Sequence, residues 1–160
     1  MTALVPTPRG LLFSSQTWRT RFEAWGWDSF DALWSLDAET VEPANVRRGG
    51  WSSVVRFVAP DGSAFYLKRQ ENHDFREWDR GIRHRPTVVR EWRMGIAFRD
   101  IGIETAEPIC LGTDVTGSSR GLLVTAALDA HCSLTEMLQT GGISGDVRRQ
   151  LWQTLAEAVP

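Results

Sequence analysis

A pair of glycines, a lysine and a glutamate are the residues of this sequence whose types and order could do chemistry. Gly49 and Gly50 lie between two stretches rich in β-branched residues. Lys68 closes a third such stretch, and Glu91 lies further along, in a segment with helical periodicity. The phosphates of a nucleotide need closely approaching backbone N–H groups, which glycines permit, and a mobile cation that a carboxylate holds in place. This order of residues therefore favours a phosphate-binding site.

Each of these residues also has an ordinary structural interpretation. A lysine at the end of a strand is commonly a surface residue, and adjacent glycines are common in hairpin turns. Glu91 could instead pair with a neighbouring side chain on the surface of its own helix. We assign Lys68 to a nucleotide because it follows the glycine pair and precedes Glu91 in the same chain.

The hydrophobic pattern predicts the elements that would position these residues. Residues 54–59 and 64–69 are β-branched and aromatic runs on either side of a Pro-Asp-Gly turn, which predicts a hairpin. Residues 87–99 predict a helix that begins with Thr87 as its N-cap. The apolar face of this helix would consist of Val88, Val89, Trp92 and Ile96.

The remaining segments can be assigned from the same patterns. Strands are expected at residues 107–113 and 121–126, and short helices at residues 17–25 and 29–36. Residues 69–86 mix charges of both signs without a sustained period. That segment is predicted to be a solvated loop or a helix that the pattern does not resolve.

Composition and charge exclude several classes of protein. The 160 residues carry 18 basic and 20 acidic side chains, and the formal charge of −2 argues against a nucleic-acid coat. The N-terminus lacks the apolar run of a signal peptide, and no stretch approaches the length of a membrane-spanning helix. Cys110 and Cys132 do not make a secreted disulfide framework, so we expect a cytoplasmic protein, with Cys110 buried in an apolar strand. The histidines and cysteines lack metal-ligand spacing, so no metal site is expected.

Four stretches, by their order and spacing, resemble one known family of enzymes. They are Arg48-Gly49-Gly50-Trp51-Ser52-Ser53, Tyr66-Leu67-Lys68-Arg69, Arg90-Glu91-Trp92-Arg93 with the following Gly102-Ile103, and Leu123-Val124-Thr125. Together they cover roughly residues 46–140. The chain thereby resembles the lipopolysaccharide-core sugar kinases, the Kdo/heptose kinase family, which share the fold of eukaryotic-type protein kinases.

The resemblance implies a role for each matched residue. The loop that covers the phosphates would consist of Gly49, Gly50, Ser52 and Ser53. Lys68 would contact the α- and β-phosphates, and Glu91 would aim it. The hinge that meets adenine through its backbone would include Thr125, Ala127 and Asp129. The implied cofactor is ATP with magnesium, and the implied acceptor is a heptose or Kdo sugar of the lipopolysaccharide inner core, on the cytoplasmic side of the inner membrane.

The resemblance also implies an α+β architecture. Residues 1–45 would form a helical N-terminal extension, residues 46–130 a protein-kinase-like small lobe, and residues 131–160 the first helices of a truncated large lobe. The small lobe would contain an antiparallel sheet of about five strands and the helix that carries Glu91. The chain departs from the family in two places. Its glycines are adjacent instead of spaced, and Ala126 and Ala127 stand where related chains often carry acids.

Two groups that phosphoryl transfer needs in this fold are missing from the sequence. It contains no His-x-Asp followed by Asn and no Asp-Phe-Gly, and so lacks the catalytic-loop aspartate and the magnesium-binding acid. His73-Asp74-Phe75 looks similar, but it precedes the helix of Glu91 and is followed by Arg76. We therefore expect this chain to carry the ATP-facing lobe only, with no catalytic residue and no metal ligand, and to be inactive alone.

The C-terminal residues leave further interpretations open. Helices are predicted at residues 133–139 and 146–159. The second helix carries an apolar stripe, which consists of Leu151, Trp152, Leu155 and Val159. This stripe would pack on a large lobe or, without one, on a partner chain. The chain could accordingly be a non-catalytic nucleotide-binding or interaction remnant, or the product of a fragmentary reading frame.

An arginine-rich segment offers one more choice. It contains Arg76, Arg80, Arg83, Arg85, Arg90 and Arg93. These side chains could face the anionic phosphates of a lipid or of the inner membrane surface, which would make the protein peripheral to that membrane. Acidic residues in and beside the segment, Glu71, Asp74, Glu77 and Asp79, make a solvated and charge-balanced segment the favoured interpretation.

Overall fold

The computed structural model describes residues 9–47, 49–77, 83–128, 139 and 144–158. The chain divides into two compact units, Met1–Ala127 and Leu128–Pro160. Every residue predicted for the nucleotide site lies in the first unit except Asp129, which falls outside the described residues.

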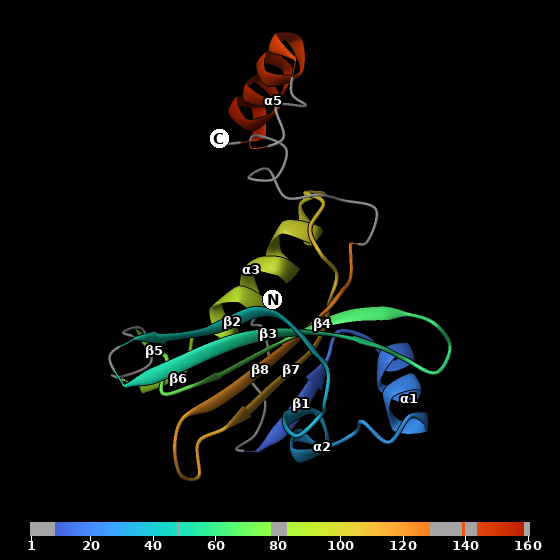
Figure 1. The fold of residues 1–160 in the computed structure, drawn as a ribbon, viewed down its shortest axis with the longest axis vertical. Coiled ribbons are helices and arrows are strands. Elements are labelled where there is room, and N and C mark those ends of the chain that lie inside the picture. The colour runs from blue at the N-terminus through green and yellow to red at the C-terminus, as the bar shows by residue number, and fades with distance from the viewer. Residues whose placement is uncertain (1–8, 48, 78–82, 129–138, 140–143, 159–160) are drawn as a thin grey trace. The chain divides into compact units, whose positions relative to one another are not determined.

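The first unit is built on a six-stranded antiparallel sheet (Figure 1). In spatial order its strands are β1 (Gly10–Phe13), β7 (Pro108–Asp114), β8 (Arg120–Ala126), β4 (Ala64–Glu71), β3 (Gly50–Val58) and β2 (Glu39–Arg47). A separate two-stranded sheet consists of β5 (Asp74–Glu77) and β6 (Arg83–Pro86). The helices of this unit are α1 (Gln16–Ala24), α2 (Phe30–Trp34) and α3 (Val88–Asp100). The predicted α+β class is confirmed, and a mostly antiparallel sheet with one packing helix is the arrangement that the resemblance implied.

One face of the sheet is covered by an aromatic core. Phe65 and Leu67 of β4 are fully buried there with Phe22 of α1 and Phe30 of α2. The indole rings of Trp18, Trp25, Trp27 and Trp34 pack around this cluster. Because side chains alternate along a strand, Lys68 and the other even-numbered residues of β4 face the opposite side of the sheet.

The helix α3 covers that opposite face. Val88, Val89 and Trp92 are buried against Leu111 of β7 and Leu123 of β8. Ile96 is partly buried against the same cluster. The apolar face predicted for this helix is therefore confirmed.

The N-terminal segment joins the sheet, which corrects the prediction that residues 1–45 are a helical extension. Strand β1 pairs with β7 from Gly10 opposite Thr113 to Phe13 opposite Cys110, and β2 begins at Glu39. The sheet thereby gains a sixth strand over the predicted five. Cys110 of β7, which lies opposite Phe13 of β1, is fully buried, as predicted, and this burial raises the pKa of its thiol.

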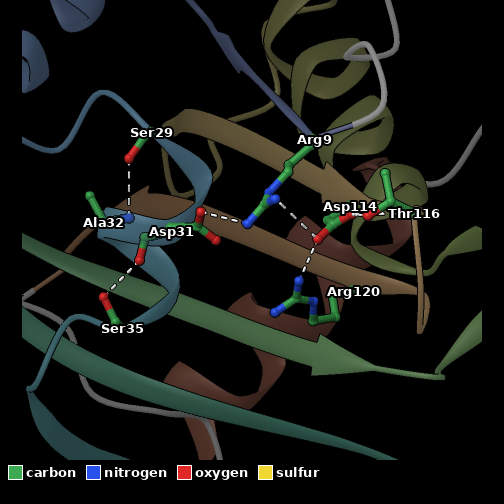
Figure 2. A network of polar contacts seen from close by, with 8 residues as sticks. All are labelled: Arg9, Ser29, Asp31, Ala32, Ser35, Asp114, Thr116 and Arg120. Atoms are coloured by element: carbon green, nitrogen blue, oxygen red, sulfur yellow. Dashed lines mark hydrogen bonds and ion pairs between the residues drawn. The ribbon is translucent and has the colours of Figure 1, made fainter.

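A buried carboxylate ties the N-terminal segment to the far end of β7 (Figure 2). Asp114 Oδ1 accepts hydrogen bonds from the backbone N–H of Thr116 at 3.0 Å and from its hydroxyl at 2.7 Å. Asp114 Oδ2 pairs with Arg120 and lies 3.9 Å from Nε of Arg9, whose Nη2 donates to Asp31 of α2 at 2.6 Å. The network therefore links β1, α2 and the β7–β8 turn.

The central hairpins follow the predictions, whereas the charged segment does not. Strands β3 and β4 form the predicted hairpin, and Gly49, with a φ of +79°, lies in the turn between β2 and β3. Residues 69–86 were predicted to be a loop or helix, but they contain the end of β4 and the paired strands β5 and β6. Thr87 precedes α3 as predicted, but its side chain makes no capping hydrogen bond, because its hydroxyl bonds to Gln70 instead.

Position 50 requires a glycine, because the turn that follows β4 leaves no room there for a side chain. A Cβ at this position would lie 2.3 Å from the backbone oxygen of Asn72. We expect Gly50→Ala to lower the free energy of unfolding by about 2 kcal/mol, because backbone atoms must shift to admit the methyl group. Gly117→Ala is the matched control, since a Cβ at Gly117 would meet nothing within 4 Å. Urea unfolding measures both variants, and equal midpoints for the two would contradict this interpretation.

The second unit contains the helix α5 (Gly145–Ala158). This helix agrees with the prediction for residues 146–159. Of the predicted apolar stripe, Trp152 is described and is 65% exposed. The side chains of Leu151, Leu155 and Val159 lie outside the described residues, as does the helix predicted at 133–139 apart from Gln139.

Candidate functional site

The predicted ion pair between Lys68 and Glu91 is present in the structure. Nζ of Lys68 donates to Oε1 of Glu91 at 2.7 Å and to Oε2 at 2.9 Å. The two side chains are 31% and 41% exposed, so they remain accessible to a ligand. Lys68 is also the only lysine among the 160 residues, beside 17 arginines. This single lysine is a sequence signal that is independent of the motifs.

A buried glutamine fixes the strand of Lys68 to the helix of Glu91. Gln70 lies two residues after Lys68 on the same face of β4 and is fully buried. Its Nε2 donates to the backbone oxygen of His73 at 2.7 Å, and its Oε1 accepts from the hydroxyl of Thr87 at 2.8 Å. The backbone N–H of Glu91 in turn donates to the backbone oxygen of Thr87 at 3.2 Å. Thr87 therefore couples the start of α3 to β4.

His73 completes this connection. Its Nδ1 lies 3.0 Å from the hydroxyl oxygen of Thr87. Because the hydrogen of that hydroxyl goes to Gln70, Nδ1 must carry the proton and donate to the oxygen. The backbone N–H of Thr87 also donates to the backbone oxygen of His73 at 3.0 Å. Gln70, His73 and Thr87 are thus linked to one another and to the backbone.

We expect Thr87→Val to destabilise the first unit by about 2 kcal/mol, since it leaves Oε1 of buried Gln70 without a donor. Thr87→Ser keeps the hydroxyl and should restore most of that loss. Chemical unfolding measures both variants. If the valine variant is instead as stable as the wild type, packing of the Thr87 methyl group, and not the hydrogen bond, holds the helix.

Ion pairs hold the other side of α3. Glu77 at the end of β5 pairs with Arg93 of α3 and, at 2.6 Å, with Arg85 of β6. The hydrogen bond from Arg93, followed by the charges of both arginines, lowers the pKa of the Glu77 carboxyl below its usual value. The guanidinium of Arg90 lies 5.4 Å from the centre of the Phe75 ring. The β5–β6 hairpin thereby restrains the helix that carries Glu91.

The loop residues predicted to cover phosphates divide between two faces of the sheet. In the β3–β4 pairing Ser52 lies opposite Gln70, on the face of Lys68. Ser53 lies opposite Arg69, on the other face. The guanidinium of Arg69 donates to the backbone oxygens of Trp34 and Leu36. The structure therefore brings Ser52, but not Ser53, onto the face of the ion pair.

The predicted hinge is described in part. Thr125 of β8 lies opposite Tyr66, which places it on the same face as Lys68. The backbone N–H of Ala127 donates to the backbone oxygen of Ala64 at 3.0 Å, so that donor is already used within the sheet. Asp129 is outside the described residues.

Comparison with known proteins assigns the chain to a family. A model of the Lipopolysaccharide kinase (Kdo/WaaP) family matches residues 31–160. The chain belongs to this family. Protein InaA of Escherichia coli (strain K12) is 29% identical to it over 140 residues, which are 82% of this chain and 62% of that protein. No solved structure matches the chain.

By its description, the matched family consists of kinases that act on lipopolysaccharide. The lysine and glutamate that the sequence pattern selected lie within the matched residues and in contact with each other. Among the described residues, no helix is long and apolar enough to cross a membrane. The chain spans 62% of the length of InaA, so the activity of a whole protein belongs to the proposal below.

Proposed function

We propose that the first unit is the ATP-binding lobe of a kinase that phosphorylates an inner-core sugar of lipopolysaccharide, with ATP bound on the sheet face of Lys68. One observation carries this proposal, the ion pair in which Glu91 of α3 holds the only lysine of the chain. An ammonium group fixed by a carboxylate, but 31% exposed, is suited to contact phosphates. Ser52, on the same face and next to the glycine turn, adds a hydroxyl donor.

The residues present fit the nucleotide better than they fit its metal ion. The phosphates would meet Lys68 and Ser52, and adenine would lie toward Thr125 at the other end of this face. Among the described residues, no group of three histidine, cysteine, aspartate or glutamate side chains could hold a metal ion. We propose contacts to the nucleotide only, and Ser53 is left out of them because it lies on the opposite face.

Selective labelling of Lys68 tests this proposal. Since the chain has one lysine, an amine-reactive reagent can modify only Lys68 and the α-amino group, and mass spectrometry separates the two products. We expect ATP, but not adenosine, to slow the labelling of Lys68 while the α-amino group reacts at an unchanged rate. If saturating ATP leaves the labelling of Lys68 unchanged, this chain does not bind ATP at the proposed site.

We further expect the 160-residue chain to transfer phosphate only at the background rate, because the acids that orient the acceptor hydroxyl and hold magnesium are missing from its sequence. Radiolabelled ATP and an inner-core oligosaccharide measure this rate. Transfer well above the rate without protein would show that other residues of this chain supply those groups.

The second candidate function is a non-catalytic interaction protein. The observation that favours it is Trp152, which is 65% exposed on α5. Large apolar side chains left in solvent are common where a partner binds. Protection of Lys68 by ATP distinguishes the two candidates, because an interaction remnant without a nucleotide site would show none.

A further inference from the structure

A polar pocket lies beside the glycine turn of the first unit and has no role in the nucleotide site described above. Its volume is about 760 Å³, and it is lined by Arg47, Asn72, His73, Asp74 and His84. These residues come from the end of β2, the turn after β4, and the β5–β6 hairpin. Its volume is within the usual range for sites of small ligands, but its described lining is polar, which favours a hydrophilic ligand.

The register of the sheet places this pocket on the same face as Lys68. Arg47 lies opposite Gly50 in the β2–β3 pairing, and Val54 lies opposite Lys68 in the β3–β4 pairing. Gly50 and Val54 are an even number of residues apart on β3, so their partners share a face. Their separation of four residue positions corresponds to about 13 Å along the strand. The pocket therefore lies beyond the ion pair, toward the glycine turn.

Two side chains of the pocket, Arg47 and His84, bind no other side chain among the described residues. In the part of the chain that the structure describes, no hydrogen bond or ion pair engages the side chain of Arg47 or that of His84. In contrast, His73 is held by Thr87, and Oδ1 of Asp74 accepts from the hydroxyl of Ser119 at 2.7 Å. The pocket thus combines fixed polar groups with an arginine fork that is available to an anion.

We propose that this pocket binds a saccharide that carries an anionic group, either a phosphate monoester or a carboxylate. Arg47 binds the anion, His84 adds a second donor, and Asn72 and Asp74 bind hydroxyl groups of the sugar. As far as the ligand is taken to be the acceptor of the kinase, this proposal rests on the proposed function. Because the pocket lies beyond Lys68, a sugar bound there would present a hydroxyl group on the side of the terminal phosphate of ATP.

The charges in the pocket determine which ligands bind. Among the described lining residues, the carboxylate of Asp74 balances the guanidinium of Arg47. A bare phosphate ion would meet the carboxylate of Asp74 as well as the guanidinium. A sugar phosphate or a sugar acid instead offers hydroxyl donors to Asp74, and it is therefore expected to bind more tightly than inorganic phosphate or a neutral sugar.

Calorimetric titration of the full chain tests the pocket with four probes, which are glucose 6-phosphate, galacturonate, glucose and inorganic phosphate. We expect one or both anionic sugars to bind at least about tenfold more tightly than glucose and phosphate. The tighter of the two identifies the anionic group. Arg47→Gln should weaken anionic-sugar binding by about tenfold or more, whereas Arg99→Gln, which removes the same charge at the far end of α3, should leave it unchanged.

Labelling of Lys68 in the same variants separates this proposal from the nucleotide site. We expect Arg47→Gln to leave the protection by ATP unchanged, and Lys68→Gln to leave anionic-sugar binding unchanged. The pocket proposal is wrong if ATP protects Lys68 but no anionic sugar binds. It is also wrong if Arg47→Gln weakens the binding of ATP as much as the binding of the sugar. If anionic sugars bind through Arg47 while ATP fails to protect Lys68, the pocket proposal holds and the proposed kinase function fails.

Discussion

Replacement of Asp114 by asparagine is expected to cause the largest loss of stability in this protein, about 3 kcal/mol at neutral pH. The carboxylate is 1% exposed and balances Arg120, whose guanidinium also lies 5.6 Å from the ring of Phe30 and 5.3 Å from that of Trp34. Removing the anion leaves a largely buried guanidinium without its partner, which typically costs several kcal/mol. Since Arg120 is 27% exposed, we expect the lower end of that range.

The same residue should make stability depend on pH in acid. The hydrogen bonds from the hydroxyl and the backbone of Thr116, followed by that from Arg120, lower the pKa of the Asp114 carboxyl from 3.8 to about 2. A carboxyl whose pKa is lower in the folded state stabilises that state above its unfolded pKa and loses this effect as the pH falls toward its folded pKa. The shift corresponds to about 2 kcal/mol. Between pH 4 and pH 2 the stability difference between wild type and Asp114→Asn should narrow by that amount.

Asp31→Asn provides the matched control for both measurements. Asp31 pairs with Arg9 in the same network, but its side chain is 62% exposed (Figure 2). An exposed pair contributes about 0–1 kcal/mol, so we expect little change in the free energy of unfolding. Urea unfolding at a series of pH values measures all three proteins. A gap between wild type and Asp114→Asn that stays constant from pH 4 to pH 2 would show that Asp114 does not titrate as described.

Long, strongly patterned elements could be predicted from the sequence, and short or charged ones could not. The β3–β4 hairpin and α3 have apolar residues at the spacing that their buried faces require, so local pattern and packing agree. Strand β1 has only four residues, which is too few to show alternation. Strands β5 and β6 contain mostly charged residues, and Glu77 holds them through ion pairs to β6 and α3. Such contacts join residues far apart in sequence and leave no local pattern.

In the candidate site, too, the residues in local motifs could be predicted, whereas those brought together only by the fold could not. The order of motifs was enough to predict that Lys68 and Glu91 meet, and the structure places them at 2.7 Å. Adjacent residues of a strand point to opposite faces, so the sequence already contained the reason why Ser52 and Ser53 cannot both lie beside Lys68. Arg47 had no comparable signal, because its pocket is assembled from β2, the turn after β4, and the β5–β6 hairpin.

Loss of ATP binding on replacement of Lys68 is the largest functional effect we expect. Lys68→Gln removes the charge that would contact the phosphates and should weaken the binding of ATP about 10- to 100-fold. The stability of the protein should change by less than about 1 kcal/mol, because the two side chains of the ion pair are 31% and 41% exposed. Calorimetry of ATP binding and urea unfolding of the same samples therefore separate a binding defect from a folding defect.

Glu91 should act on ATP only through Lys68, and a double-mutant cycle can show this. Glu91→Gln keeps the ammonium group but removes the carboxylate that aims it through hydrogen bonds of 2.7 and 2.9 Å, so we expect a smaller loss of affinity, about fivefold. If Glu91 serves only to orient Lys68, adding Glu91→Gln to Lys68→Gln should cause no further loss, because the group to be oriented is gone. Losses that multiply in the double variant would instead mean that Glu91 affects the nucleotide independently of the lysine. In that case the close contact between the two side chains would be a feature of folding and not of ATP binding.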